Sequence, residues 1–144
     1  MKILMGVDDS KYADDILRAI LAWRPAENTE VLVVHVLQPV GPAPPQMHPG
    51  YAPELESERE AAQALVHRIA TELRCAGFKA DTLVGVGDVR EGLIDAAADW
   101  HADLIIVGSH GLTGMHRFLL GSVSEFVVRH APCSVEIVRS TARP

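Results

Sequence analysis

The sequence predicts an α/β fold: an open, mostly parallel sheet of five strands in the order 3-2-1-4-5, with helices on both faces. Five short apolar segments alternate along the chain with four amphipathic segments of helical period. Two of the apolar segments, 31–36 and 104–107, are apolar almost throughout, as is typical of parallel strands covered on both faces. Right-handed crossovers then leave only a few doubly wound arrangements.

The expected strands are rich in Val, Ile and Leu. They are Lys2–Val7, Glu30–Leu37, Lys79–Val86, Asp103–Val107 and Cys133–Arg139. Apolar and polar residues alternate more in the third and fifth strands, which indicates one less covered face. We therefore expect these two strands nearer the edges of the sheet.

The expected helices cover 11–24, 53–76, 89–100 and 123–130. Pro25 and Pro132 follow the first and the fourth helix and prevent their continuation. Gly77 stands where the second helix would have its C-terminal cap. Asp88, three residues before Glu91, is the N-cap candidate of the third helix.

The 144 residues are the length of one domain, and we expect a single domain over 1–144. Six of the nine prolines lie between Gln38 and Pro53. This segment is expected to be an extended loop. A flexible connection is the favoured interpretation, and a lid over a ligand is the alternative. Residues 140–144 are expected to be a frayed tail.

Composition excludes several classes of partner. The formal net charge is −6, from 13 Lys and Arg against 19 Asp and Glu, which argues against nucleic-acid binding. Three lysines form no basic patch for a membrane surface, and no apolar run approaches the roughly 20 residues of a membrane span. The first residues lack a signal-peptide pattern, and Cys75 and Cys133 cannot form a disulfide framework. We therefore expect a cytoplasmic protein.

A glycine-containing segment after the fourth strand is the main candidate for chemistry. Gly108, Gly111 and Gly121 precede Ser122, where a helix is expected to begin. Glycines let backbone N–H groups approach an anion, and a helix N-terminus adds free N–H groups and a positive dipole end. Together they predict a polyphosphate cradle. Taken singly, each residue is more often structural, since Ser122 and Glu125 also form a capping box and Gly108 could be only a tight turn.

Other chemical motifs are not met. None of the three lysines follows a glycine, so there is no Walker A loop. Gly85 and Gly87 begin a dinucleotide fingerprint, but Arg90 stands at its third glycine position. The seven histidines show no consistent ligand spacing, which argues against a metal held by protein side chains alone.

Asp8 lies at the end of the first strand. In an open parallel sheet, ligands bind beyond the carboxyl ends of the strands where the strand order reverses, here between the first and fourth strands. Asp8 and Gly108 end those two strands. Asp8 could accept hydrogen bonds from a ribose or base, or hold Mg²⁺ bound to phosphates. Alternatively it caps the first helix, as Asp9 or Ser10 also could.

The chain resembles the universal stress protein family, in its ATP-binding subgroup. The family's nucleotide motif, G-x2-G-x9-G-(S/T), is matched by Gly108, Gly111, Gly121 and Ser122. Val7–Ser10 resembles the family's V-D-x-S turn, and Val34–Val36 resembles its second strand. Gly87–Asp88 resembles the start of its third helix, and His130–Cys133 the entry to its last strand. The likeness covers nearly the whole chain.

By this resemblance, a bound ATP would be held through the first, second and fourth strands. Asp8 and Val36 would line the adenosine end of the site, and Val107 would lie near the base. Gly6 and Val7, which precede Asp8, are expected to belong to the same binding site. The ribose and phosphates would be held by Gly108, Ser109, Gly111, Gly121 and Ser122, flanked by Val123. Two positions depart from the family. Asp9 replaces a usual Gly, and Leu112 replaces a common Arg, which leaves Arg117 as the nearby guanidinium.

The function expected from these features is that of an ATP-binding regulatory module in the stress response. ATP would bind with Mg²⁺ or Mn²⁺ held through its phosphates. The resemblance also implies a homodimer formed through the last strand, with Val135, Ile137 and Val138 at its edge. Dedicated catalysis is not expected; the alternatives are a slow ATPase or nucleotide hydrolase, and a ligand-free dimeric interaction module.

Overall fold

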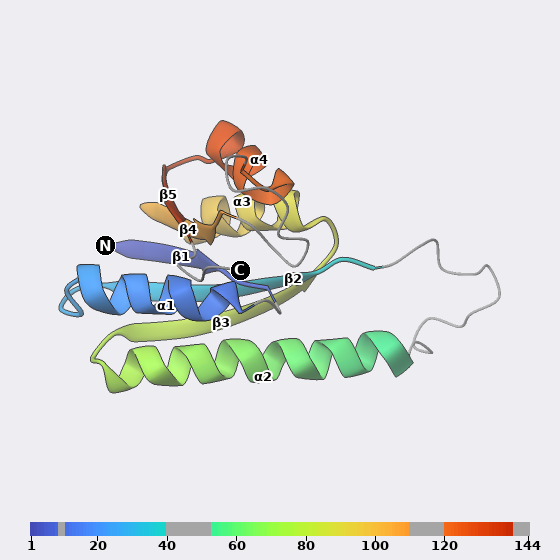
Figure 1. Ribbon diagram of the computed structural model, residues 1–144, viewed down its shortest axis with the longest axis horizontal. Coiled ribbons are helices and arrows are strands. Elements are labelled where there is room, and N and C mark those ends of the chain that lie inside the picture. The colour runs from blue at the N-terminus through green and yellow to red at the C-terminus, as the bar shows by residue number, and fades with distance from the viewer. Residues whose placement is uncertain (9–10, 40–52, 110–119, 140–144) are drawn as a thin grey trace.

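The computed structural model describes residues 1–8, 11–39, 53–109 and 120–139. Strands and helices alternate along the chain (Figure 1). The elements are β1 (Lys2–Gly6), α1 (Tyr12–Trp23), β2 (Glu30–Leu37), α2 (Pro53–Cys75), β3 (Lys79–Val86), α3 (Val89–Trp100), β4 (Leu104–Gly108), α4 (Ser122–His130) and β5 (Ser134–Val138). Each of the nine expected elements is present within two residues of its expected bounds.

The five strands form one sheet in the order β3-β2-β1-β4-β5, and all four strand pairs are parallel. The predicted fold class and strand order are confirmed. β3 and β5 are the two edge strands, as the alternation in their sequences indicated. β1 lies in the middle and is buried along most of its length, because it has a neighbour on each side and helices on both faces.

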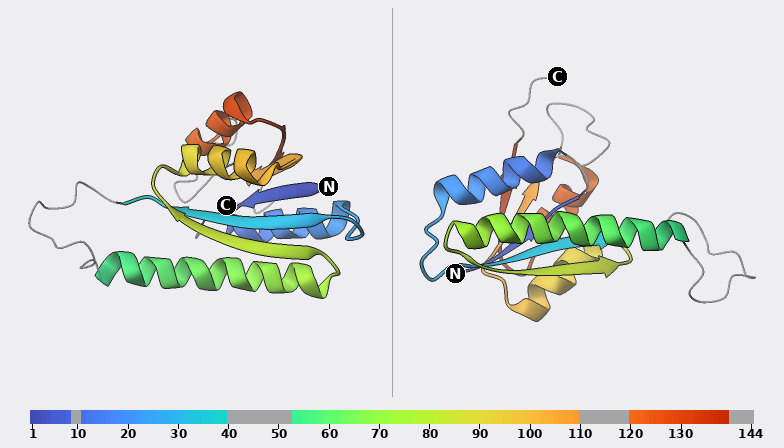
Figure 2. Two further views of the ribbon diagram at one scale, coloured as in Figure 1. Left: turned by 180° about the vertical axis from the view of Figure 1, so that it is seen from behind. Right: turned by 90° about the horizontal axis from the view of Figure 1, so that it is seen from below.

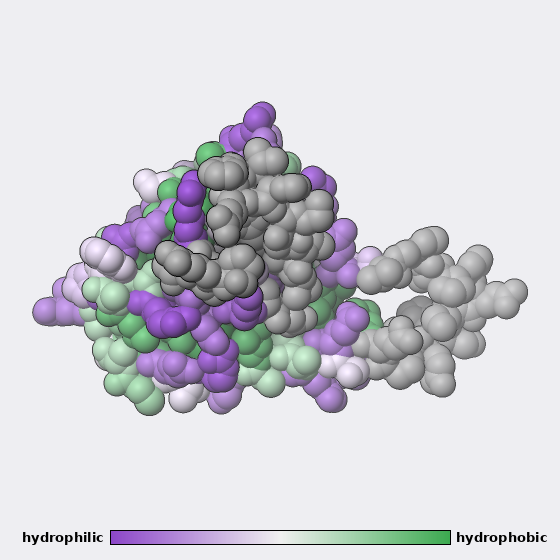
Figure 3. Space-filling model, viewed as in Figure 1, coloured by the Kyte–Doolittle hydropathy of each residue, from purple (hydrophilic) through white to green (hydrophobic). Residues whose placement is uncertain are grey.

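Helices cover the sheet in two layers (Figure 2), with α1 and α2 on one face and α3 and α4 on the other. Alternate residues of β1 supply the two cores: Ile3 and Met5 pack in the layer of α1 and α2, and Leu4 packs in the layer of α3 and α4. On the outer surface seen in Figure 3, hydrophilic and hydrophobic side chains are interspersed over the described residues, as is usual for solvated helices.

The end of α2 is closed by Gly77, as expected. Gly77 has φ +95°, and its N–H donates to the Arg74 carbonyl at 3.0 Å while the Phe78 N–H donates to the Leu73 carbonyl at 3.0 Å. This pair of bonds is a Schellman motif, which needs a left-handed residue at the position of Gly77. It returns the chain to the sheet with Leu73 and Phe78 both in the core.

The two tryptophans lie at the amino ends of the strands. Trp23 ends α1 and is 78% exposed. Trp100 ends α3, where its carbonyl accepts a hydrogen bond from Lys2 Nζ at 3.3 Å and its ring lies 5.1 Å from that ammonium. Lys2 thus joins the start of β1 to the end of α3. None of the described helices combines the length and the hydrophobicity that a membrane span requires.

Candidate functional site

The candidate site lies where β1 and β4 separate, and we call the region between the carboxyl ends of these two strands the crevice. The β1–β4 ladder ends at the pair Met5 and Ile106, whereas the β1–β2 ladder continues to Gly6 and Val34. Beyond Met5, β1 therefore stays with β2 and moves away from β4. This is the point of the sheet at which the strand order reverses, where ligands of open parallel sheets bind.

The β1 side of the crevice is closely packed at Gly6. A Cβ atom at Gly6 would meet Val107 Cγ1 at 2.9 Å and Leu93 Cδ2 at 3.2 Å. The absence of a side chain thus lets Val107 of β4 and Leu93 of α3 close over the end of β1. These contacts give Gly6, a predicted binding residue, a role in packing.

Val7 is held to β2 through both of its backbone groups. Its N–H donates to the Val34 carbonyl at 2.9 Å, and its carbonyl lies 3.0 Å from Nδ1 of the buried His35. The Val7 side chain is itself in the core below α1. Asp8, which is half-buried, is the next residue and leaves the sheet at this fixed point.

Val36, predicted at the adenosine end, is buried against α3. A Cβ atom at Gly92 would lie only 3.0 Å from Val36 Cγ2, so Gly92 allows this close approach of helix and strand. Val36 also lines a cavity of about 190 Å³ at the carboxyl ends of β2 and β3, together with Gly85, Glu91 and Asp95. Asp88 lines the same cavity, so Val36 has a limited apolar surface in a cavity with three carboxylates.

The β4 side of the crevice is built from hydrogen bonds to Ser109. The Ser109 N–H donates to the Val138 carbonyl at 3.0 Å, which fixes the end of β4 to β5. The Ser109 carbonyl accepts from the Gly121 N–H at 2.8 Å and lies 3.2 Å from the Ser124 hydroxyl. Ser109 is thus joined to residues 12 and 15 positions further along the chain, and these bonds place the start of α4 directly beside the end of β4.

Ser124 is the residue of this site that sequence reasoning missed. It is buried, and its hydroxyl oxygen lies 2.9 Å from the Gly121 carbonyl oxygen and 3.2 Å from that of Ser109. The hydroxyl can donate its hydrogen bond to either carbonyl. The signal was the pair of serines, Ser122 and Ser124, before Glu125. Either serine could have faced the protein, and only tertiary packing shows which one does.

The N-terminus of α4 has no side-chain cap. The N-cap residue is Gly121, with φ −65° and ψ 161°, so the interpretation of Ser122 as the cap is wrong: Ser122 is the first helical residue and is exposed. The backbone N–H groups of Ser122, Val123 and Ser124 make no hydrogen bond to another described residue. Such N–H groups, together with the helix dipole, form an anion-binding arrangement.

The N-terminus of α3 is closed by contrast. Asp88 is its N-cap, as expected, and its carboxylate accepts from the N–H groups of Arg90 and Glu91 at 2.9 and 3.2 Å. The Arg90 guanidinium lies 3.1 Å from the same carboxylate. The hydrogen bond from the Arg90 side chain, followed by that from the Glu91 backbone, lowers the pKa of Asp88. The N-terminal N–H groups of α3 are therefore already bonded to an anionic group of the protein, the Asp88 carboxylate.

Several predicted features lie outside the described residues. They are Gly111, Asp9, Ser10, Leu112, Arg117, the tail 140–144 and most of the Pro-rich segment. The expected cap of the first helix is not found among described residues, because its N-cap is Lys11 and no side chain caps it there. Within the described ranges, His, Cys, Asp and Glu side chains form no group of three that could hold a metal ion.

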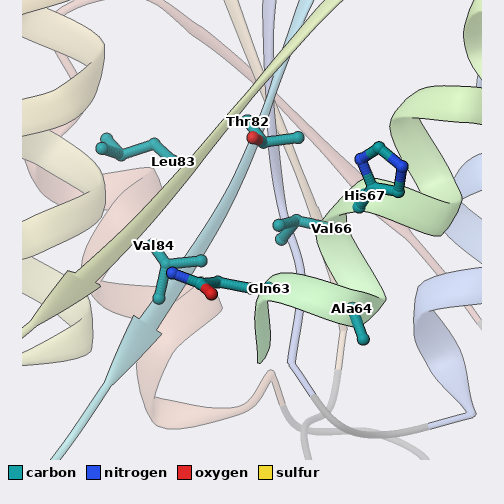
Figure 4. A pocket seen from close by; sticks show the side chains of 7 residues that line it. All are labelled: Gln63, Ala64, Val66, His67, Thr82, Leu83 and Val84. Carbon is teal, nitrogen blue, oxygen red and sulfur yellow. The ribbon is translucent and has the colours of Figure 1, made fainter. Parts of the chain in front are cut away.

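A second cavity lies away from all predicted site residues. It has a volume of about 580 Å³ and lies between α2 and the edge strand β3, lined by Gln63, Ala64, Val66, His67, Thr82, Leu83 and Val84. Figure 4 shows the side chains of α2 and β3 that surround it. Its walls combine apolar side chains with an amide, an imidazole and a hydroxyl group, from Gln63, His67 and Thr82.

Solved structures of other proteins share the fold of this chain. A structure from Methanocaldococcus jannaschii, solved to assign that protein's biochemical function, superposes with a TM-score of 0.79 and 29% identity, and covers 99% of this chain and 97% of its own. Two further structures match with lower identity. An Arabidopsis thaliana family protein with AMP bound has a TM-score of 0.73 and 18% identity, and the match covers 99% of this chain and 93% of that protein. An Archaeoglobus fulgidus protein in complex with dAMP has a TM-score of 0.69 and 22% identity, and the match covers 96% of this chain and 97% of that protein.

Curated relatives match over the same length. A universal stress protein of Synechocystis is 29% identical over 150 residues, which are 96% of this chain and 97% of the relative. The universal stress protein of Methanocaldococcus jannaschii is 30% identical over 155 residues, 96% of this chain and 94% of its own. The family model of universal stress proteins matches residues 1–139. The chain therefore belongs to the universal stress protein family.

Proposed function

We propose that the chain binds an adenine nucleotide in the crevice between β1 and β4, and that the physiological ligand is ATP with Mg²⁺ or Mn²⁺ held through its phosphates. The phosphates would lie against Gly108, Ser109 and the first turn of α4. The adenosine end would extend toward Asp8 and Val36. The nucleotide would act as a regulatory ligand, with occupancy of the crevice altering the surface that a partner recognises.

The open N-terminus of α4 is the observation that carries this proposal. Its first N–H groups have no described protein partner, and Gly121 contributes no side chain to compete with a ligand. The hydrogen bond from Gly121 to Ser109 holds these donors beside the end of β4. A phosphate supplies both the negative charge and the acceptor oxygens that such donors need.

The class of nucleotide is supported by the bound complexes. Proteins of the same fold hold AMP and dAMP, and therefore this architecture accommodates an adenine ring and a phosphate in those proteins. The length of the phosphate chain is a separate question for this chain. This donor row, the backbone N–H groups of Ser122, Val123 and Ser124 in the first turn of α4, offers several contacts and favours a polyphosphate over a single phosphate.

Calorimetric titration of the purified chain with adenosine, AMP, ADP and ATP tests this function. Affinity is expected to rise with each phosphate in the presence of Mg²⁺, because each adds charge and acceptors at the donor row, and to fall for ATP when EDTA removes the metal. GTP serves as the control for base selectivity. Equal binding of adenosine and ATP would remove the phosphate assignment, and failure of every nucleotide to bind would favour a ligand-free module.

Two measurements separate the other functions. Release of phosphate from ATP over many turnovers, lost in Asp8→Ala, would establish an ATPase in place of a regulatory ligand. The homodimer is proposed through β5, an edge strand on which Val135, Ile137 and Val138 are only half-buried within one chain. Light scattering is expected to give twice the chain mass, and a single-chain mass at micromolar concentration would contradict it.

A further inference from the structure

His35 is a buried polar residue in the middle of the molecule that binding of a nucleotide does not itself explain. Its exposed fraction is 4%, whereas the other described histidines, His67, His101 and His130, are exposed. It lies near the carboxyl end of β2, on the same face of that strand as Val31 and Val33. Its ring nitrogen Nδ1 lies 3.0 Å from the Val7 carbonyl oxygen.

This contact fixes the position of one ring proton. A carbonyl oxygen can only accept a hydrogen bond, so Nδ1 must carry a proton and act as the donor. The Val7 carbonyl needs such a donor because Val7 lies beyond the last β1–β4 pair, Met5 and Ile106. A buried carbonyl without a partner would cost the protein stability.

We propose that His35 is a positioning residue of the nucleotide site. Two neighbouring residues of β2 hold Val7: the Val34 carbonyl accepts its N–H at 2.9 Å, and the His35 ring binds its carbonyl. Asp8 follows directly, so the direction in which it leaves the sheet is set by the orientation of the Val7–Asp8 peptide. His35 thus acts on nucleotide affinity through Asp8 without touching the ligand. This inference rests on the proposed function.

Two substitutions of His35 separate the hydrogen bond from the ring. In His35→Asn the side-chain amide places an N–H where Nδ1 lies in the native ring, whereas His35→Leu keeps apolar volume and removes the donor. Titration with ATP and Mg²⁺ is expected to show about a tenfold loss of affinity in His35→Leu, the typical worth of one buried hydrogen bond. His35→Asn is expected to recover most of that loss. Equal affinity in all three proteins would overturn the inference.

A double-mutant cycle tests whether the effect passes through Asp8. In the Asp8→Ala background, His35→Leu is expected to cause no further loss of affinity, because the group that His35 positions is already gone. A general loss of fold quality would instead reduce affinity by the same factor in both backgrounds. Additive losses would therefore contradict the positioning role, even if each variant binds weakly.

A measurement on the nucleotide-free protein separates this inference from the proposed function. Long-range ¹H–¹⁵N correlation spectra of the imidazole ring are expected to show the proton on Nδ1, and hydrogen exchange is expected to be faster at the Asp8 amide in His35→Leu than in the native chain. An Nδ1 atom without a proton would overturn the positioning role whether or not nucleotides bind. Native protein that shows the Nδ1 proton but binds no nucleotide would overturn the proposed function, and with it the effect on affinity.

Discussion

Two helices of the same layer, α3 and α4, both begin at the carboxyl ends of the strands, and their first turns are built differently. Each follows a parallel strand, and they pack against each other, with the Arg90 guanidinium 5.4 Å from the Phe126 ring. Asp88 supplies α3 with a carboxylate that occupies its first N–H groups. Gly121 supplies α4 with no side chain, and its first N–H groups make no bond to another described residue. One helix end is thus completed by a carboxylate of the protein, and the other has no such group among the described residues.

The difference extends to how each helix is attached. Leu93 of α3 packs where a Cβ of Gly6 would lie, so α3 is fixed through its apolar face. α4 shares that core through Val127, which is fully buried, and in addition makes polar contacts beside the crevice, from Gly121 and Ser124 to the Ser109 carbonyl. The N-cap backbone of α4 thus takes part in the attachment of that helix to β4, whereas the N-cap side chain of α3 bonds to N–H groups of its own helix.

The largest expected effect comes from giving α4 the kind of cap that α3 has. Gly121→Asp is expected to reduce ATP affinity about 100-fold, because a carboxylate near the protein surface repels phosphates a few ångströms away by a few kcal/mol. The free energy of unfolding should be unchanged or rise by a few tenths of a kcal/mol, about the gain from Gly to Asp at an N-cap. Calorimetry and urea unfolding measure the two quantities.

Gly121→Asn is the matched control, since it caps the helix without charge. Its loss of affinity is expected to be clearly smaller than that of Gly121→Asp. If Gly121→Asp bound ATP as tightly as the native chain, the N-terminus of α4 would not be the phosphate site.

A substitution at Gly6 is next in size and tests the attachment of α3. Gly6→Ala places a Cβ 2.9 Å from Val107 Cγ1 and 3.2 Å from Leu93 Cδ2, and is expected to lower the free energy of unfolding by about 1–3 kcal/mol. Gly85→Ala is the control, because its Cβ would meet only Val36 Cγ2 at 3.9 Å, and it should change stability by less than about 0.5 kcal/mol. Equal effects in urea unfolding would mean that the packing at Gly6 is not tight.

Removal of the Ser124 hydroxyl tests the attachment of α4. Ser124→Ala is expected to lower the free energy of unfolding by about 1 kcal/mol, since one buried hydrogen bond is lost while Gly121 still donates to Ser109. ATP affinity should fall as well, because the donor row is held less firmly beside β4. The exposed Ser122→Ala serves as the control for stability, and a loss there equal to that of Ser124→Ala would contradict the assignment of the two serines.

The smallest expected effect is at the closed end of α3, and it depends on pH. The pKa of Asp88 is lowered in the folded protein, first by the hydrogen bond from the Arg90 side chain, so its carboxylate stabilises the fold above its unfolded pKa. Asp88→Ala should therefore lower the melting temperature by a few degrees at neutral pH. The difference from the native chain should shrink as the pH falls below about 4, where the carboxylate becomes protonated.

Asp88→Asn keeps an acceptor for the helix N–H groups and separates the cap from the charge. Thermal unfolding followed by circular dichroism across this pH range compares the three proteins. A difference between Asp88→Ala and the native chain that stays constant as the pH falls would mean that the charge of Asp88 contributes nothing.

The same pair of helices shows what the sequence could predict. Asp88 was predictable as a cap because an acid three residues before Glu91 is a local pattern, and the strand order is one of the few that right-handed crossovers leave for such apolar segments. Gly121 was predicted as a phosphate contact and Ser122 was the candidate for the cap of α4, whereas the N-cap residue is Gly121. The serine that faces inward is chosen by the Ser109 carbonyl, which lies 15 residues from Ser124 along the chain. Local patterns carry no information about such a partner.

The β1 side of the crevice has the same limit. Gly6 and Val7 were expected there from the resemblance of the first strand to the family, but the side chains that surround Gly6 belong to α3 and β4. The role of His35 had no signal of its own, since one histidine in an apolar strand shows neither its partner nor its tautomer. Its bond to Val7 becomes visible only when β1 and β2 are placed side by side.

The location of Trp23 and Trp100 determines what intrinsic fluorescence can report. Both indole rings lie at the amino ends of the strands, and the crevice lies at the carboxyl ends. Emission should therefore follow the loss of the whole fold while remaining almost unchanged when the crevice is filled. A tryptophan introduced near the β4–α4 junction would give the protein an optical signal for occupancy, with the two native indoles as the internal reference.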